Sequence, residues 1–417
     1  MQDNEKKPAL RFKGFTDPWE QRKLAELTKT ITTGKSVNSD EGEVSDGNIG
    51  VLKTSCVSYD RFNPSESKPV VKSEQQLVKC AVEKDSVIVS RMNTPERVGA
   101  CGYVSTDFPN LFLPDRLWKL KFQDTVDTYF VYMMLVSSAY KEKITSMASG
   151  TSGSMYNIPK ETFLNLQLVI PAKIDEQKQL GKILKKIDTL ITLHQRKYEK
   201  LVNIKKSMLD KMFPKNGASV PEIRFKGFTD PWEQRKISEL AEKTYGGGTP
   251  TTSNEAFWNG NIPWIQSSDI VDGKLMGVEP RKYITQTGLN SSATQLVPKD
   301  SIAIITRVGV GKLAYMPFSY STSQDFLSLS KLNTEPFFTV YACYKKLQSE
   351  LNTVQGTSIK GITKDELLAK TISVPVYSEQ KQIGSFFTQL DTLITLHQRK
   401  LEKLQNIKKS CLEKMFV

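Results

Sequence analysis

The sequence predicts an α+β protein in which two mixed α/β globules are joined by two long antiparallel coiled-coil helices, as a pseudo-twofold internal repeat. Three observations support this fold class: a duplicated set of sequence blocks, two dissimilar segments enclosed by them, and an apolar pattern at helical spacing in each copy. A chain of 417 residues corresponds to about two to four domains at roughly 150 residues each, which agrees with two globules.

The duplicated blocks set the order of the elements. RFKGFTDPWEQRK occurs at 11–23 and again at 224–236. DTLITLHQRK occurs at 188–197 and again at 391–400. The segments between these blocks hardly resemble each other, so one repeated arrangement carries two different inserts.

Short likenesses inside the inserts indicate a common fold. KDSVIVSR at 84–91 and KDSIAIITR at 299–307 are each typical of a polar turn followed by a buried strand that ends in Arg. We expect four regions, namely a first globule at 1–173, a helix at 174–214, a second globule at 215–375 and a second helix at 376–417.

The second block predicts a helix of nearly 40 residues in each copy, or roughly 58 Å at ~1.5 Å per residue. A 3-4 spacing of mostly apolar residues forms a seam along each helix. The seam residues are Leu184, Ile187, Ile191, His194, Tyr198, Leu201, Lys205, Met208 and Met212, and in the second copy Phe387, Leu390, Ile394, His397, Leu401, Leu404, Lys408, Cys411 and Met415.

The only two histidines, His194 and His397, hold equivalent seam positions near the middle of each helix. If the helices are antiparallel, the two side chains meet and fix the register, as isolated polar seam residues do in coiled coils. An exposed or water-bridged pair is the alternative. A metal site is disfavoured, because zinc needs three or four ligands and no Cys lies nearby in the sequence.

The net charge of +13 favours a polyanionic partner, either nucleic acid or an anionic membrane surface. The two helical blocks carry ten basic and five acidic residues at 175–213, and seven and four at 379–416. No apolar stretch approaches the ~20 residues of a membrane span, and the polar start carries no secretion signal, so we expect a cytoplasmic protein. The five cysteines lack a C-x-x-C pair, and we expect reduced thiols.

Motifs of catalysis do not appear in the sequence. There is no Asn/Asp-Pro-Pro-aromatic tetrad of a methyltransferase, and GVGKL at 309–313 lacks the Ser/Thr and the spacing of a phosphate-binding loop. Two histidines, both in predicted helices, disfavour a Ser-His-Asp or Cys-His site. We therefore expect no catalytic residue and no metal site on this chain.

The duplicated set of blocks resembles the DNA specificity subunit of type I restriction-modification enzymes, over the whole chain. The likeness is carried by GGGTPTTSNEAFWNGNIPWIQSSDI at 246–270, by Gly356-Thr357-Ser358, and by EQKQIG at 379–384 leading into DTLITLHQRK. The first globule departs from this pattern, with ITTGKSVNSDEGEVSDGNIGVLKTSCV at 31–57 in place of the Gly-Thr-Pro opening.

The resemblance implies a non-catalytic subunit with two target-recognition domains, which read the two halves of a bipartite, asymmetric double-stranded DNA target across an unread gap. It implies two copies of a DNA methyltransferase subunit and restriction/translocase subunits as partners. S-adenosylmethionine, ATP and magnesium would enter through those partners, with no cofactor on this chain. We expect docking on the repeated helices, with the RFKGFTDPWEQRK blocks as a further docking candidate. A helical scaffold or adaptor that binds protein or RNA is the alternative function.

Polar side chains on predicted loops are the candidates for DNA contacts, because donors and acceptors read base edges. In the second globule these are Thr249, Gln266, Ser267, Arg307, Thr357, Ser358 and Lys360. In the first globule they are Lys35, Lys53, Arg91, Asn93, Arg97, Thr151 and Ser152. Arg91 and Arg307 are favoured since each ends one of the matching strands, whereas a cap, a turn or a solvated charge is the alternative for each candidate. Trp19 and Trp232 fit either core packing, which we favour, or anchors for a partner.

Overall fold

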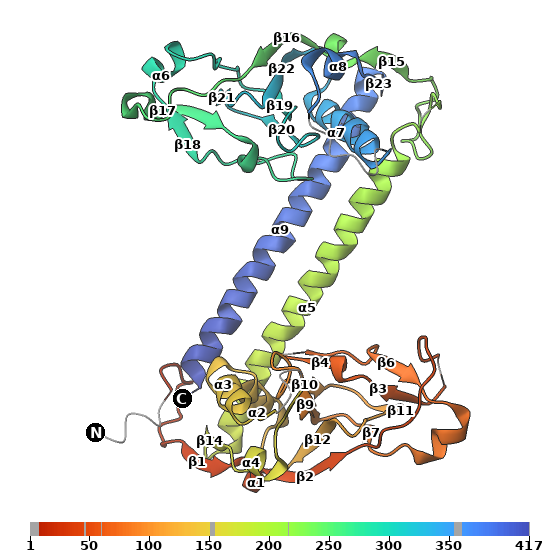
Figure 1. The fold of residues 1–417 in the computed structure, drawn as a ribbon, viewed down its shortest axis with the longest axis vertical. Helices are drawn as coiled ribbons and strands as arrows, with labels where there is room; N and C mark the ends of the chain where they lie inside the picture. Colours follow the sequence, from red (N-terminus) through yellow and green to blue (C-terminus); the bar gives the residue numbers. More distant parts are fainter. Residues whose placement is uncertain are drawn as a thin grey trace. The chain divides into compact units, whose positions relative to one another are not determined.

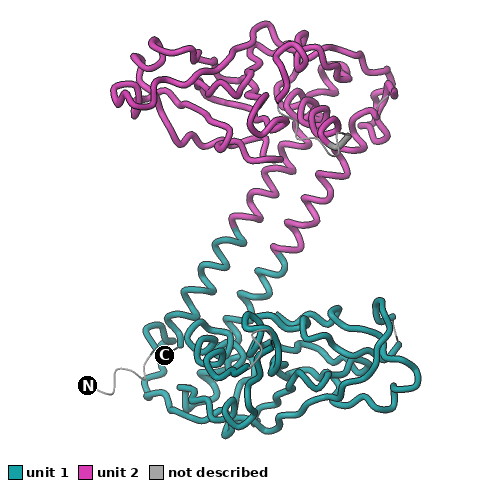
Figure 2. Tube along the Cα trace, viewed as in Figure 1, with its two compact units in different colours: residues 1–193, 400–417 teal, residues 194–399 magenta. Residues whose placement is uncertain are grey.

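The computed structural model describes residues 8–45, 47–59, 61–150, 155–215, 217–353 and 361–416. The chain divides into two compact units, unit 1 from residues 1–193 and 400–417 and unit 2 from residues 194–399 (Figure 2). Each unit contains one globule and a part of each long helix, α5 (Ile174–Lys211) and α9 (Tyr377–Met415) (Figure 1).

The main sheet of unit 1 has four antiparallel strands in the order β10-β8-β12-β2. They are β10 (Cys101–Val104), β8 (Ser86–Ser90), β12 (Leu117–Phe122) and β2 (Thr28–Thr33). Every residue of β8 is buried, which confirms the buried strand expected from KDSVIVSR. The apolar helix α2 (Thr128–Leu135) and helix α3 (Ser138–Ser146) pack into the same core as the sheet.

The other elements of unit 1 are short. A mixed sheet has the order β6-β3-β11-β7, with β3 and β11 parallel. Its strands are β3 (Gly50–Leu52), β6 (Ser67–Pro69), β7 (Ala81–Val82) and β11 (Phe108–Phe112). Three two-stranded pairs and two short helices complete the unit: β1 (Glu20–Lys23) with β14 (Gln167–Ile170), β9 (Met92–Asn93) with β13 (Tyr156–Asn157), β4 (Val57–Ser58) with β5 (Arg61–Phe62), α1 (Leu24–Leu27) and α4 (Lys160–Leu164).

The main sheet of unit 2 also has four antiparallel strands, in the order β20-β19-β22-β16. They are β20 (Leu313–Met316), β19 (Ser301–Ile305), β22 (Phe326–Leu332) and β16 (Ala241–Gly246). The remaining elements are β15 (Glu233–Lys236) with β23 (Thr371–Val374), the sheet of β18 (Lys282–Ile284), β17 (Trp258–Ile265) and β21 (Ser321–Thr322), and the helices α6 (Gln286–Asn290), α7 (Pro336–Thr353) and α8 (Lys364–Ala369).

The two main sheets correspond strand for strand, although their sequences hardly match. Val87 pairs with Leu120 in unit 1, and Ile302 pairs with Leu329 in unit 2. The matching strands β8 and β19 are both entirely buried, so a short run of buried apolar residues is enough to specify this sheet in both inserts. Outside the sheet the units diverge, because α2 and α3 of unit 1 stand where unit 2 has the single helix α7.

Helices α5 and α9 have 38 and 39 residues, which confirms the two predicted long helices. Their seam residues are buried or half-buried, as the 3-4 pattern requires. In unit 1, Leu184 near the start of α5 shares a core with Met415 at the end of α9. In unit 2, Met212 at the end of the α5 block shares a core with Phe387 near the start of α9. The start of one helix thus packs beside the end of the other in each unit, and the antiparallel prediction is confirmed.

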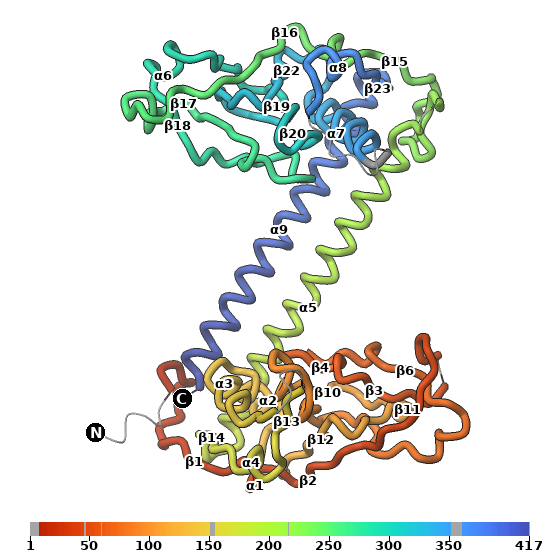
Figure 3. Tube along the Cα trace, in the orientation of Figure 1, coloured from red at the N-terminus to blue at the C-terminus, as the bar shows by residue number. Residues whose placement is uncertain are grey.

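The segment before each RFKGFTDPWEQRK block caps the end of a long helix. The Leu10 N–H donates to Lys414 O of α9 at 2.9 Å, and the Ile223 N–H donates to Lys211 O of α5 at 2.9 Å. Figure 3 shows the first described segment of the chain, in red, beside the last turn of α9 in unit 1. Both bonds satisfy carbonyl groups that a helix end leaves without an intrahelical partner.

Candidate nucleic-acid interface and the contacts that position it

The RFKGFTDPWEQRK blocks dock on the starts of the long helices. Arg11 donates from Nε and Nη2 to the two carboxylate oxygens of Glu176, at 2.6 and 2.8 Å. Arg224 makes the same bidentate contact with Glu379, at 2.8 and 2.8 Å. The Glu176 and Glu379 side chains are only 2% and 0% exposed, and the hydrogen bonds to them raise the pKa of both arginines. The helix dipole favours acidic residues in the first turn of a helix. Glu176 and Glu379 have a second role there, because they bind the arginines of the repeated blocks.

The tryptophans of the blocks belong to the cores. Trp19 is 1% exposed and packs edge-on against Phe130, and its indole Nε1 donates to Glu176 Oε1 at 3.3 Å. Trp232 is 4% exposed and packs against Phe338. Of the two interpretations of these tryptophans, core packing is the one that their burial supports.

The EQKQ sequence at each helix start ties the globule to the helix through its Gln. Gln177 accepts from the Asp127 N–H at 3.1 Å and donates to Pro171 O at 2.9 Å. Gln380 makes the same two bonds, to Glu335 N at 2.8 Å and Pro375 O at 2.8 Å.

The Gly that follows EQKQ is needed for close approach. A Cβ atom at Gly181 would lie 2.5 Å from Asp127 Oδ1, and one at Gly384 would lie 2.4 Å from Glu335 Oε2. Both acidic groups accept a backbone N–H at the start of α2 or α7, where burial raises their pKa. Intramolecular docking therefore accounts for the repeated Glu, Gln and Gly.

A Tyr–Asp–Lys cluster repeats in each unit at the junction of globule and helices. In unit 1, Tyr129 Oη donates to Asp188 Oδ2 at 2.5 Å, and Lys408 Nζ lies 2.9 Å from Asp188 Oδ1. In unit 2, Tyr341 Oη donates to Asp391 Oδ2 at 2.6 Å, and Lys205 Nζ lies 2.6 Å from Asp391 Oδ1. Each cluster joins a globule helix, one long helix and the opposite long helix.

These clusters explain why the apolar seam contains lysines. Lys205 and Lys408 are each 12% exposed, and each faces an Asp of the opposite helix rather than a second apolar side chain. Burial, followed by the charge of the Asp, raises the pKa of both tyrosines far above its ordinary value, so the phenols stay protonated and keep donating.

The two histidines meet in unit 2. Nδ1 of His194 and Nδ1 of His397 are 2.8 Å apart, and the rings are half-buried with centroids at 5.0 Å. Since one nitrogen must donate and the other accept, at least one imidazole is neutral. Within the described residues, no group of three or more His, Cys, Asp or Glu side chains is placed to hold a metal ion.

In unit 2 the candidate DNA contacts gather around the segment that leads into β22. Thr249 is exposed and donates to Gln324 Oε1 at 2.6 Å, and Ser267 donates to Asp325 Oδ2 at 3.3 Å. Gln266 is half-buried, and its backbone N–H donates to Asp269 Oδ2 at 3.0 Å. Arg307 is exposed and follows Thr306, whose N–H donates to Asp325 O at 2.7 Å.

In unit 1 the candidates are more scattered. Arg91 is half-buried, and its Nε donates to Asp115 O at 2.7 Å, at the start of β12. Lys35 and Arg97 are exposed on loops, and Lys53 is half-buried with its N–H donating to Glu66 O at 2.9 Å. Asn93 is 8% exposed, and its amide donates to Ser90 Oγ at 3.0 Å, so it already has partners inside the unit.

Five candidates lie outside the residues that the structure describes. They are Thr151, Ser152, Thr357, Ser358 and Lys360.

Three polar residues beside these loops, Ser36, Asp115 and Gln324, are not among the residues that the sequence predicted. Ser36 donates to Asp115 Oδ1 at 2.6 Å, the counterpart of the bond from Thr249 to Gln324. A usable signal was present, because Ser36 follows Arg11 at the same distance in sequence as Thr249 follows Arg224.

The profile of the type I restriction modification DNA specificity domain matches residues 16–203 and 229–406. The chain belongs to this family. The two matches give each copy of the internal repeat one DNA specificity domain, so the protein has two recognition domains. The family is one of specificity rather than of catalysis, and membership does not favour the scaffold or adaptor alternative.

Individual relatives agree with this membership. The chain is 21% identical over 403 residues to the MjaX type I restriction enzyme specificity subunit of Methanocaldococcus jannaschii, covering 94% of this chain and 91% of that protein. It is 30% identical over 169 residues to the EcoR124I/EcoR124II specificity subunit of Escherichia coli, covering 39% and 41%. The fold is similar to the crystal structure of a type I restriction-modification S subunit from M. genitalium, with a TM-score of 0.67, 17% identity and 99% of each chain covered.

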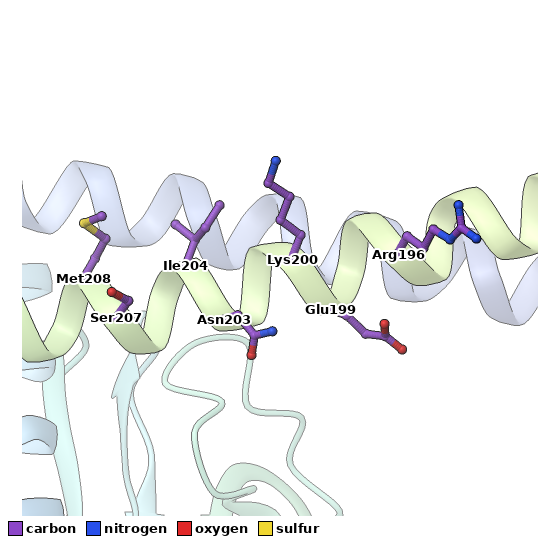
Figure 4. Close-up of a pocket in the computed structure, with 7 residues that line it drawn as sticks. All are labelled: Arg196, Glu199, Lys200, Asn203, Ile204, Ser207 and Met208. Atoms are coloured by element: carbon purple, nitrogen blue, oxygen red, sulfur yellow. The ribbon is translucent and has the colours of Figure 1, made fainter. Parts of the chain in front are cut away.

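In unit 2, residues of α5 line an open groove of about 480 Å³. Figure 4 shows Arg196, Lys200, Ile204 and Met208 in a row along α5. The complete lining is Arg196, Glu199, Lys200, Asn203, Ile204, Ser207 and Met208.

Among the described helices, none is long and apolar enough to cross a membrane.

Proposed function

We propose that this chain is the targeting subunit of a type I restriction-modification complex, in which its two domains read the two halves of a bipartite, asymmetric DNA sequence. The observation that carries the proposal is that two main sheets of the same strand order present different polar residues beside equivalent strands. Two unlike surfaces on one repeated framework suit two unlike half-sites. We assign the recognition domains to 1–173 and 215–375, with the helical spacers at 174–214 and 376–417.

Exposed basic side chains beside the loops supply contacts to phosphate. Arg97 in the first domain and Arg307 in the second are exposed, and Arg91 is held next to the start of β12. The other exposed or half-buried loop candidates described above remain part of the proposed surface, whereas Asn93 is buried and bonded inside the unit. The net charge of +13 favours binding to DNA.

The partners follow from a row of residues that is repeated in the sequences of the two long helices. The groove residues from Arg196 to Met208 recur as Arg399, Glu402, Lys403, Asn406, Ile407, Ser410 and Cys411, with only Met208 changed in type. A residue pattern that occurs once on each long helix suits two copies of one DNA methyltransferase subunit, with restriction/translocase subunits completing the complex. These partners would bring S-adenosylmethionine, ATP and magnesium, and the complex would act in the cytoplasm.

The RFKGFTDPWEQRK blocks have an intramolecular role, because their first Arg binds a Glu at the start of a long helix and their Trp is buried in the core. We therefore assign partner docking to the helices. His194 and His397, at 2.8 Å, and the two Lys–Asp contacts together define the register of the helix pair.

The test is genome-wide modified-base sequencing of cells that express this chain with a cognate methyltransferase subunit, against cells that lack only this chain. We expect one split, asymmetric methylated motif to appear. Exchanging residues 215–375 for the same region of a relative should change one half of the motif and leave the other half unchanged.

A soluble complex that adds no methylated motif would contradict the proposal. The salt dependence of duplex DNA binding gives a second measurement, because neutralising phosphates makes log affinity fall linearly with log salt concentration. Binding that does not respond to salt would indicate a partner other than DNA.

A further inference from the structure

The two domains share one loop geometry. It occurs where β2 in unit 1, or β16 in unit 2, ends beside the segment that precedes the neighbouring strand, β12 or β22. Thr33 pairs with Trp118 in unit 1, and Gly246 pairs with Leu327 in unit 2. A glycine follows directly in each domain. A Cβ at Gly34 would lie 1.5 Å from Leu113 O, and one at Gly247 would lie 1.8 Å from Ser323 O. No other residue type fits there, so the loop is held against the backbone of that segment.

Two residues beyond each glycine, a hydroxyl group orients one polar side chain. Ser36 Oγ donates to Asp115 Oδ1 at 2.6 Å, and Thr249 Oγ1 donates to Gln324 Oε1 at 2.6 Å. The donor is a hydroxyl in both domains, whereas the acceptor is a carboxylate in one and an amide in the other. The framework is therefore repeated, and the chemistry that it presents is different.

These side chains are accessible, and in unit 1 basic groups lie beside them. Gln324 and Thr249 are exposed, as is Ser36, and Asp115 is half-buried. Arg116 next to Asp115 is exposed, and Arg91 Nε donates to the Asp115 carbonyl. Among the described residues, the hydrogen bond from Ser36 uses Oδ1 of Asp115, and the one from Thr249 uses Oε1 of Gln324, so Asp115 Oδ2 and the Gln324 Nε2 amide take no part in these two bonds. Each hydroxyl thus fixes one end of the group and leaves the other end available.

The two acceptors match different bases. An amide of Gln reads adenine in the major groove, by donating to N7 and accepting from the N6 amino group. A carboxylate accepts from the N4 amino group of cytosine. The oxygen of Gln324 keeps a second lone pair after accepting from Thr249, so both bonds to adenine can form.

We propose that Gln324 recognises an adenine in one half of the DNA target and that Asp115 recognises a cytosine in the other half, with Thr249 and Ser36 as the positioning residues. This inference rests on the proposed function, and it adds the residues and the bases that determine specificity. The hydroxyls hold each side chain in place before DNA arrives, which lowers the conformational cost of binding.

The experiment uses the full chain in complex with its methyltransferase subunit. The DNA probes are duplexes that carry the motif found by methylome mapping, together with every single base-pair substitution of it. Gln324→Glu keeps the length of the side chain and the acceptor for Thr249 but removes the amide donors. We expect its preference to move from adenine to cytosine at one position of one half-site. Asp115→Asn should move the preference from cytosine toward adenine at one position of the other half-site.

The expected discrimination at each affected position is about 5- to 150-fold, the range of a good side-chain contact to a base. Matched controls are Gln234→Glu on β15 and Asp124→Asn on the exposed loop at the opposite end of β12 from Asp115, which make the same chemical changes away from the proposed base contacts. Both controls should retain the wild-type preference at every position.

A second pair of variants covers the case in which a charge change prevents folding. Thr249→Val and Ser36→Ala remove only the positioning hydroxyl, and each should weaken discrimination at the same position as its partner. Unchanged preference at all positions, or weakening that is uniform across all duplexes, would overturn the inference. If the wild-type complex itself prefers no sequence, the proposed function fails rather than the assignment of these residues.

Discussion

The starts of the two long helices use the same contacts, whereas the loops beside the two main sheets do not. Arg11 with Glu176 and Arg224 with Glu379 are both bidentate, and Tyr129 with Asp188 and Tyr341 with Asp391 are both short hydrogen bonds. At the loops, a Ser–Asp pair in unit 1 stands where unit 2 has a Thr–Gln pair.

This difference separates what holds the molecule together from what it recognises. Residues of the duplicated blocks are occupied by contacts between each globule and the helices, so either copy is constrained by its own packing. Some insert residues, such as Tyr129 and Tyr341, also contact the long helices. The polar groups on the loops beside the main sheets make no such contact in the Ser36–Asp115 and Thr249–Gln324 pairs, and they differ between the two units. The two docking sites are not identical, however, since Trp19 donates to Glu176 while the buried Trp232 Nε1 has no hydrogen-bond partner among the described residues.

The largest expected effect is loss of the docking arginine. Arg224→Ala leaves the carboxylate of Glu379, 0% exposed, buried without its cation, and should destabilise the start of α9 by about 3–5 kcal/mol. Arg11→Ala should cost less, because Glu176 keeps the hydrogen bond from Trp19. Hydrogen–deuterium exchange at the first turns of α5 and α9 in the full chain measures both.

The corresponding control is the double change Trp19→Phe with Arg11→Ala, which removes the remaining donor to Glu176. Its cost at the start of α5 should approach that of Arg224→Ala. Equal protection losses in the two single arginine variants would show that the indole contributes nothing to the difference.

The next effect concerns the seam lysines. Lys205→Asp places a second carboxylate beside Asp391, and Lys408→Asp does the same beside Asp188. Each should cost about 2–3 kcal/mol, and adding Asp391→Lys or Asp188→Lys should restore at least half of the loss. Chemical unfolding followed by circular dichroism at the helical band measures these values. A double variant as unstable as its single variant would contradict the pairing.

A smaller effect is a dependence on alkaline pH. The pKa of Tyr129 and of Tyr341 is raised in the folded protein, first by burial and then by the facing Asp. Because the pKa of each tyrosine is higher in the folded than in the unfolded protein, the folded state is stabilised by a constant amount below about pH 10, the pKa of a free tyrosine. This stabilisation decreases as the pH rises above about 10. Tyr129→Phe with Tyr341→Phe should cost about 1–2 kcal/mol per site at neutral pH and flatten the decline above pH 10.

Thermal unfolding at a series of pH values separates this contribution from that of other tyrosines. Burial raises the pKa of Tyr320 to about 12, for instance, and its share of the decline should persist in the double variant. A decline above pH 10 of unchanged steepness would contradict the role of the two clusters.

The smallest effect belongs to the histidines. His194→Ala and His397→Ala should each cost about 1 kcal/mol, with a coupling of about 0.5–1.5 kcal/mol in a double-mutant cycle, because their hydrogen bond is only half-buried. Zero coupling would leave the register of the helix pair to the Lys–Asp contacts alone.

Much of the fold was predictable because it depends on local patterns. The 3-4 seam gave helices close to their observed 38 and 39 residues, and the runs at 84–91 and 299–307 gave the central strands of both main sheets. The candidate DNA contacts stay predictions. Arg91, Thr249 and Arg307 lie beside the strands as expected from their positions, whereas Asn93 is buried and Ser36 is not among the predicted residues. Sequence spacing does not show which loop residues face inward.

The sequence by itself determined the duplication, the two long helices, the fold class and the likeness to a DNA specificity family. These features follow from periodic burial and repeated blocks, which can be recognised without knowing how distant segments meet. Only the tertiary structure decided that Glu176 binds Arg11 and that Ser36 orients Asp115. The same holds for Asp188, which binds both Tyr129 and Lys408. These contacts join residues far apart in the chain, and strand register and helix docking, rather than local spacing, bring their polar groups within hydrogen-bonding distance.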